Sequence, residues 1–262
     1  MPYDCLPSPR PWRSVFLSDV HLGSAGCRAA QLLRFLDGID TERLYLVGDI
    51  IDAESLSERF FWPRLHNEVL NRLFRLAQAG MRVVYIPGNH DAFARAHVGL
   101  RIGRIEIHRH AVHLAGNGRR YLVMHGDEFD HHLDRRSWQN QLGAVLYRQL
   151  VRVNSSVNDW RDRNGRAYLP LASAIKQRSS RARRYIEQYR AACLASAAAR
   201  GLDGAITGHI HRPEIHDSDG QLYMNCGDWV EHCTAIGEDE DGRFELMSPA
   251  VGIKRDPEHA TA

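Results

Sequence analysis

Short clusters of aspartate, histidine and asparagine follow apolar runs at five places in this chain, and this repetition is the strongest constraint on its fold. Runs of this length, bounded by polar residues and glycine, indicate buried strands. Side chains placed just after the ends of parallel strands meet at one edge of a sheet, so the pattern predicts an α/β fold in which the clusters converge. The apolar runs are Val15–Leu17, Leu44–Val47, Val83–Ile86, Tyr121–Met124 and Gly204–Thr207.

The polar clusters combine carboxylate, amide and imidazole groups, a set of oxygen and nitrogen donors that suits divalent cations. Two cations about 3.5–4 Å apart need one ligand shared between them and further ligands on each side, and such a pair can direct a water at phosphorus. The sequence therefore predicts a two-metal centre, with Mn²⁺ as the expected metal and Fe²⁺ or Zn²⁺ as alternatives. The clusters are Asp19-Val20-His21, Gly48-Asp49, Gly88-Asn89-His90-Asp91, His125-Gly126-Asp127 and Gly208-His209-Ile210-His211.

In order and composition these clusters resemble the calcineurin-like metallophosphoesterase superfamily, whose pattern reads D-x-H, G-D, G-N-H-[DE], H and G-H-x-H. The resemblance extends over about three quarters of the chain. It implies a two-sheet β-sandwich core flanked by helices, the four-layer metallophosphoesterase fold, with a helical cap insertion. It also implies that Asp49 bridges the metals. The first metal would be held by Asp19, His21, Asp49 and His211, and the second by Asp49, Asn89, His125 and His209.

The resemblance further implies roles for two residues that are not metal ligands. His90 matches the family's histidine that stabilises the transition state or protonates the leaving oxygen, a role that suits a side chain whose proton is available near neutral pH. Asp52 matches the aspartate that orients this imidazole. A scaffold protein with an idle site is the alternative, and the complete ligand set argues against it.

Composition indicates an intracellular enzyme with no membrane span. The chain of 262 residues has a net charge of +2, and its five cysteines form no C-x-x-C pair, which favours reduced thiols. It has no apolar run of about 18 residues and no signal-peptide pattern at its start, so we expect a cytoplasmic protein. Helical spacing at Arg28–Leu36 and Leu65–Gln78 predicts helices that pack between the strands.

The stretch between the His125 and His209 clusters is longer than a core connection requires. We therefore divide the chain into a metallophosphoesterase core, residues 1–127 and 203–262, and a helical, basic cap insertion, residues 128–202. An apolar stripe from Trp138 to Val153 indicates one helix of the cap, and a longer helix is expected from about Arg181 to Ala199.

Basic side chains are concentrated in this insertion. Residues 161–190 carry nine basic and two acidic side chains, a local net charge of +7. Arginine and lysine can clamp phosphate oxygens, and a basic amphipathic segment can also contact a membrane surface. A solvated charged face is the alternative interpretation. The expected substrate contacts are Asn89, Asp127, Lys176, Arg178 and Arg183.

Within the superfamily, the sequence most resembles the bacterial UDP-2,3-diacylglucosamine pyrophosphatases of lipid A synthesis and their relatives, with which it shares the segments G-D-I-I-D and G-H-I-H-R-P. The established lipid A enzymes carry arginine where this chain has His90. The resemblance implies a UDP-linked or lipid-linked substrate, cleaved to UMP and a lipid sugar 1-phosphate. The basic amphipathic insertion motivates a further hypothesis, peripheral contact with the inner membrane surface.

Other activities stay open at this point. A cyclic-nucleotide or general phosphodiesterase would use the same metals without needing an apolar cap. A nuclease is less favoured, because the aromatic residues of the insertion do not alternate with basic ones as a base-stacking surface requires. The sequence does not predict the oligomeric state.

Five further polar residues lie near the predicted strands or after the last ligand cluster. His108, His110 and His113 lie in or beside a predicted strand and are interpreted as solvated side chains. Asn225 and Asp228 follow the last ligand cluster and could lie behind the metal ligands.

Overall fold

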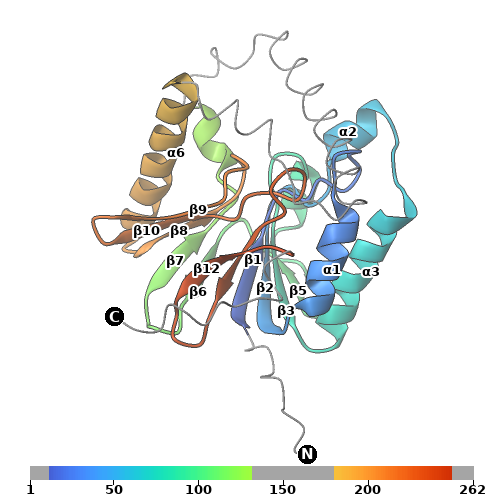
Figure 1. Ribbon diagram of the computed structural model, residues 1–262, viewed down its shortest axis with the longest axis horizontal. Helices are drawn as coiled ribbons and strands as arrows, with labels where there is room; N and C mark the ends of the chain where they lie inside the picture. Colours follow the sequence, from blue (N-terminus) through green and yellow to red (C-terminus); the bar gives the residue numbers. More distant parts are fainter. Residues whose placement is uncertain (1–11, 132–179, 250–262) are drawn as a thin grey trace, which may run out of the picture.

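Two β-sheets form the centre of the molecule, and helices cover their outer faces (Figure 1). The computed structural model describes residues 12–131 and 180–249 of the chain. The seven-stranded sheet has the order β12-β11-β1-β2-β3-β5-β4, and the five-stranded sheet has the order β6-β7-β8-β10-β9. This architecture confirms the two-sheet α/β sandwich expected from the sequence.

The larger sheet is built around three parallel strands whose apolar residues are buried on both faces. These are β1 (Trp12–Leu17), β2 (Thr41–Val47) and β3 (Arg82–Ile86), in a register that pairs Val15 with Leu44 and Leu44 with Val83. Their carboxyl ends therefore lie at the same edge. The sheet is completed by β4 (Arg101–Ile102), β5 (Ile105–Ile107), β11 (Ala235–Glu238) and β12 (Phe244–Met247).

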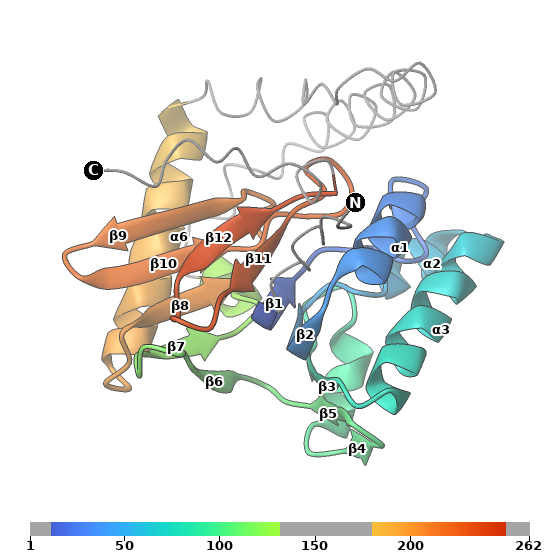
Figure 2. The ribbon, with the colours of Figure 1, turned by 60° about the horizontal axis from the view of Figure 1, so that its bottom comes forward.

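The smaller sheet also has a parallel centre, formed by β7, β8 and β10. Strands β7 and β8 are the apolar runs that precede the His125 and His209 clusters, so these clusters leave neighbouring strands in the same direction. The strands are β6 (Ala111–Leu114), β7 (Arg120–Val123), β8 (Gly204–Thr207), β9 (Glu214–Ser218) and β10 (Gln221–Asn225). The two sheets touch at their edges through β9 and β12 (Figure 2).

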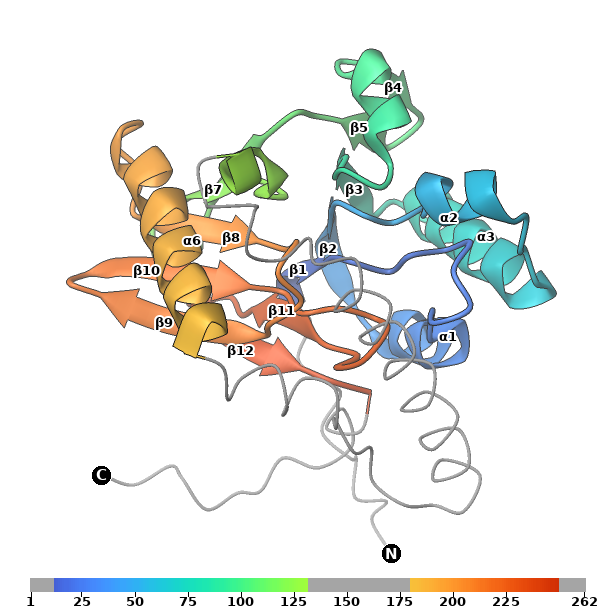
Figure 3. The same cartoon turned by 90° about the horizontal axis from the view of Figure 1, so that it is seen from above.

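Helices lie on opposite sides of the sandwich (Figure 3). On one side, α1 (Ala29–Gly38), α2 (Ala53–Glu58) and α3 (Arg64–Gln78) lie beside the larger sheet, where α1 and α3 pack on each other and on the sheet. On the other side, α6 (Ser180–Ala198) covers the smaller sheet. Two short 3₁₀ helices, η1 (Ala92–His97) and η2 (Asp127–His131), follow the His90 and His125 clusters.

Helix α6 confirms the long helix expected near Arg181 to Ala199, and it packs directly on the smaller sheet. Its buried residues Ile186, Tyr189 and Cys193 belong to one apolar cluster with Leu122 of β7 and Tyr223 of β10. The helix expected from Trp138 to Val153 lies outside the described residues, and the division of the chain into core and cap stays a prediction. Within the described part of the chain, no helix is long and apolar enough to cross a membrane.

A buried histidine between the sheets corrects one expectation. His113 is not solvated: its exposed fraction is 0 %, its Nδ1 lies 3.1 Å from the hydroxyl of Tyr45, and its Nε2 lies 2.8 Å from Oε2 of the equally buried Glu238. Both ring nitrogens are thus partnered, which makes the burial of this polar ring tolerable. His108 and His110 are partly exposed, as expected.

Candidate metal centre

The five clusters meet at the edge where β1, β2, β3, β7 and β8 end. Backbone hydrogen bonds join the first two: the amide of Asp19 donates to the carbonyl of Gly48 (3.0 Å), and the amide of His21 to the carbonyl of Asp49 (2.9 Å). The amide of His209, from the other sheet, donates to Oδ2 of Asp19 (2.9 Å). The convergence of both sheets on one centre is therefore built into the main chain.

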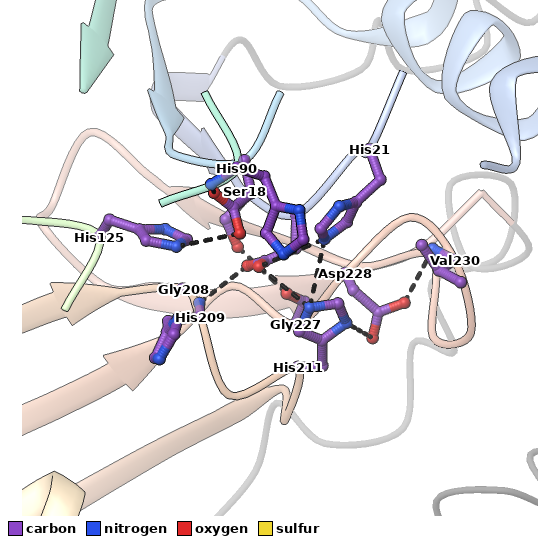
Figure 4. Close-up of polar contacts among 12 residues, drawn as sticks. Ser18, His21, His90, His125, Gly208, His209, His211, Gly227, Asp228 and Val230 are labelled. Carbon is purple, nitrogen blue, oxygen red and sulfur yellow. Dashed lines mark hydrogen bonds and ion pairs between the residues drawn. The ribbon is translucent and has the colours of Figure 1, made fainter. Parts of the chain in front are cut away.

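One group of predicted ligands contains Asp19, His21 and His211. Oδ1 of Asp19 lies 3.2 Å from Nε2 of His211 and 3.9 Å from Nε2 of His21, and the two Nε2 atoms are 3.4 Å apart. Figure 4 shows these rings turned toward the same small space. Three donor atoms at this spacing can hold a metal ion.

A second group contains Asp49, His125 and His209, whose potential ligand atoms lie within 4.8 Å of one another. Oδ2 of Asp49 lies 3.3 Å from Nε2 of the buried His125. Asp49 also belongs to a group with His21 and His90, so its carboxylate lies close to donor atoms of both groups. Asn89, the remaining predicted ligand, is exposed at this edge.

Glycine is required where the backbone passes close to these groups. A Cβ atom on Gly88 would lie 2.2 Å from Oδ1 of Asp49 and 2.7 Å from Nε2 of His125. A Cβ atom on Gly208 would lie 2.6 Å from Oδ2 of Asp19. The glycines of the clusters therefore leave the space into which the ligands point.

Each predicted histidine ligand has one ring nitrogen facing a carboxylate or carbonyl oxygen, which leaves the other nitrogen for a metal. Such partners fix the ring orientation and raise the basicity of a ligand. In addition, Nε2 of His125 and Oδ1 of Asp19 are buried without a hydrogen bond. The residues thus fit a pair of divalent cations. The contacts are His21 Nδ1 with Asp52 Oδ2 (3.2 Å), His125 Nδ1 with the Val47 carbonyl (2.9 Å), His209 Nε2 with Asp130 Oδ2 (3.0 Å) and His211 Nδ1 with Asp228 Oδ2 (3.8 Å).

Backbone strain is concentrated at the same positions. Five of the predicted ligands have left-handed φ angles between 53° and 70°, a conformation that costs a non-glycine residue about 1–2 kcal/mol. The surrounding hydrogen bonds hold them in this state, and their side chains are thereby aimed at the centre. These residues are Asp19, His21, Asp49, His209 and His211.

Asp52 contacts two histidines at once. Its Oδ1 lies 3.0 Å from Nδ1 of His90, and its Oδ2 lies 3.2 Å from Nδ1 of His21. Oδ1 also accepts the amide of Ser55 (2.9 Å) and so caps α2. Burial would lower the pKa of His90, but Asp52 and Asp49 raise it to about 9 in the metal-free protein. The expected partner of His90 is therefore in contact with it, and it reaches a predicted metal ligand as well.

The two central aspartates are ionised at neutral pH. Burial would raise the pKa of Asp49, but the charge of the neighbouring His125 holds it well below its usual range. Burial would likewise raise the pKa of Asp19, and His211 lowers it. Both carboxylates are thus available as anionic ligands.

Asp91 was not singled out by the sequence, although it is the last residue of the G-N-H-[DE] pattern. It is fully buried, and it accepts hydrogen bonds from the amides of Ile50 (2.7 Å) and Gly88 and from the hydroxyl of Tyr85 (2.7 Å). These bonds fix the loop that carries Asp49. Asp130 was also missed, since it lies outside every cluster.

The expected substrate contacts are only partly described. The carboxylate of Asp127 is held by Nη2 of Arg95, at 2.8 and 2.7 Å, and Arg183 is exposed on α6. Lys176 and Arg178 lie outside the described residues. Asp228, by contrast, is fully buried behind His211, and its Oδ2 lies 2.6 Å from Nδ1 of His232.

Comparison with known proteins gives a consistent picture. The family model described as "Calcineurin-like phosphoesterase" matches residues 13–213. A UDP-2,3-diacylglucosamine hydrolase from Edwardsiella ictaluri is 27 % identical over 261 residues, covering 90 % of this chain and 92 % of the relative. A protein of the same name from Photorhabdus laumondii is 26 % identical, covering 90 % of this chain and 98 % of the relative. Another from Neisseria meningitidis serogroup B is 27 % identical, covering 87 % and 95 %.

Proposed function

Since the chain belongs to the calcineurin-like phosphoesterase family and is a metal-dependent phosphoester hydrolase, we propose that it cleaves a UDP-linked or lipid-linked substrate such as UDP-2,3-diacylglucosamine. The bond would be a phosphoester or pyrophosphate, and this substrate would give UMP and a lipid sugar 1-phosphate. The observation that carries the proposal is the pair of donor groups, Asp19–His21–His211 and Asp49–His125–His209, linked by the proximity of Asp49 to His21. The names of the relatives support the substrate class.

We assign the ligands as two sets that share Asp49. Bound divalent cations supply Lewis acidity to the phosphoryl oxygens and lower the pKa of water. The chain's own part is to hold its donor atoms at fixed positions through strained backbone and ring-nitrogen partners. One cation would contact Asp19, His21 and His211, and the other His125 and His209. The family pattern adds Asn89 to the second set.

His90 is assigned to the leaving group. Its Nδ1 is occupied by Asp52, so Nε2 is the nitrogen that can donate a proton to the departing oxygen. Its ring centroid lies 4.7 Å from that of His21, a proposed ligand of the first metal. Asp52 would hold the ring in this orientation and stabilise its protonated form.

Exposed aromatic residues in the segment between α2 and α3 support a lipid-linked substrate. Phe60 is 79 % exposed and Phe61 40 %, and Phe61 lines an open pocket together with Ser24, Cys27 and His66. His66, which lines this pocket, accepts the amide of Gly23 at 3.1 Å, and Ser24 of the lining follows His21 by three residues in the sequence. Apolar side chains exposed beside a polar centre suit a substrate that carries acyl chains.

The test is release of UMP from UDP-2,3-diacylglucosamine by the protein loaded with Mn²⁺, with the Asp49→Ala variant as blank. Release from the acylated substrate but not from UDP-glucosamine supports the proposal, and a joint Phe60→Ser and Phe61→Ser variant should then raise KM for the acylated substrate alone. Cleavage of a simple aryl phosphodiester without UMP release would instead favour a general phosphodiesterase. Turnover retained in the Asp49→Ala variant would refute the bridging role.

A further inference from the structure

We propose that Asp130 and Tyr185 are positioning residues for the second metal, acting through His209, and that α6 thereby controls occupancy of that metal position. This inference rests on the ligand assignment proposed above. It concerns residues outside the five clusters: Asp130 lies in η2, directly after the His125 cluster, and Tyr185 lies on α6.

The three side chains form a continuous polar chain. The hydroxyl of Tyr185 donates to Oδ1 of Asp130 at 2.7 Å, and Oδ2 of Asp130 lies 3.0 Å from Nε2 of His209. With Nε2 donating to the carboxylate, Nδ1 is the nitrogen left for a metal. The hydroxyl fixes the carboxylate, and the carboxylate fixes both the ring orientation and the tautomer of His209.

A second tyrosine, one helical turn further along α6, holds the main chain of the same ligand loops. Tyr189 is fully buried, and its hydroxyl lies 3.1 Å from the carbonyl of His125 and 3.3 Å from that of Gly208. A Cβ atom on Gly126 would lie 1.9 Å from this hydroxyl, so the loop passes directly against the ring. Residues four apart on a helix share a face, and this face of α6 points at both loops.

The contacts of η2 and α6 described above involve the ligands proposed for the second metal and not those proposed for the first. The ring-nitrogen partners of His21 and His211 are Asp52 and Asp228, and both come from the core strands' own loops rather than from residues 128–202. Loss of the α6 contacts should therefore weaken the second metal and leave the first in place. A general loss of stability would weaken both.

The experiment titrates Mn²⁺ into metal-free full-length protein by calorimetry and follows low-temperature electron paramagnetic resonance, which distinguishes a coupled metal pair from a single ion. We expect Asp130→Asn to raise the Kd of the second equivalent about 10–100-fold, with the first unchanged. Tyr185→Phe, which removes only a hydroxyl, should raise it about 2–10-fold, the equivalent of one hydrogen bond. Asp217→Asn and Tyr121→Phe are matched controls, because Asp217 is an exposed residue of β9 and Tyr121 has no role in the polar chain described above.

Several outcomes would overturn the inference. Equal weakening of both equivalents would reduce Asp130 to a general structural residue, and unchanged titrations would remove its role. Asp130→Glu should restore part of the affinity for the second Mn²⁺ equivalent. If it binds that equivalent no better than Asp130→Asn while the first equivalent stays normal, the role of Asp130 is still supported, and the contact requires the shorter carboxylate. If the wild-type protein takes up a single equivalent, the two-metal assignment itself is wrong and this inference falls with it.

Discussion

Replacing Asp52 tests the assignment of His90 most directly, because Asp52 has separable structural and chemical roles. The variant Asp52→Ser keeps an oxygen that can accept the amide of Ser55 and so cap α2, but it removes the carboxylate that contacts His90 and His21. Serine and aspartate are comparable N-caps, so we expect the free energy of unfolding of the metal-free protein to change by less than about 1 kcal/mol from the cap.

The chemical effect should be much larger. Burial lowers the pKa of His90, and the hydrogen bond of Asp52 is the largest influence that raises it to about 9. Without it the ring loses both its orientation and its preference for the protonated form. General acid catalysis is worth roughly 10²–10⁴-fold, so kcat for a poor leaving group should fall by that factor, or about 3–5.5 kcal/mol in the activation free energy.

The assay compares two phosphodiesters at saturating Mn²⁺, one with an alkoxide leaving group and one with 4-nitrophenolate. Saturation removes any effect on metal affinity through His21. The nitrophenolate departs without a proton, so its kcat should fall far less than that of the alkyl ester. Equal losses on both substrates would refute the reasoning, since they would show that Asp52 does not act through proton donation by His90.

Three further predictions follow from the buried polar groups. Asp228→Asn should raise the Kd of the first Mn²⁺ about 10–100-fold in the same titration, because it loosens His211, and an effect on the second equivalent alone would contradict this. His113→Ala should lower the free energy of unfolding in urea by about 1–3 kcal/mol, since Oε2 of Glu238 is left buried without its histidine partner while Oε1 keeps the amide of Gly116, and an unchanged free energy would show that the pair is not stabilising. Burial lowers the pKa of His66, so its contribution to stability is complete above the unfolded pKa of 6.5 and is lost as pH falls through the folded pKa. His66→Asn should therefore reduce the difference in the free energy of unfolding between pH 7 and pH 5, and an unchanged difference would contradict the lowered pKa.

The fold was largely predictable because its strongest determinants are local. Continuous apolar runs predicted β1, β2, β3, β7 and β8, and helical spacing predicted α1, α3 and α6 to within a few residues. In each of these elements the pattern of apolar residues identifies the face, or both faces, that the fold buries. The same reasoning is what made the convergence of the clusters predictable.

The burial of His113 shows where such reasoning stops. A histidine between apolar residues on a short strand looks the same whether it faces solvent or the core. What decides is Glu238, 125 positions away, together with the hydroxyl of Tyr45. A buried polar side chain is stable only with its partners, and partners from distant strands leave no periodic signal.

In the candidate centre, the proposed ligands could be predicted from the sequence, but most of the groups that orient them could not. The ligand types are readable because they stand in compact clusters, but an imidazole can bind a metal through either nitrogen, and its orientation is set by whatever holds the other one. Here the holding groups are the backbone carbonyl of Val47 at the end of β2 and the carboxylates of Asp52, Asp130 and Asp228, which lie far apart in the sequence. Transfer of the five clusters to another sheet would supply the ligands without these groups, so the rings would have to be ordered at the expense of metal affinity. The metal affinity of each proposed position therefore depends on residues that the clusters do not contain. For the second position these include Asp130 on η2 and Tyr185 on α6.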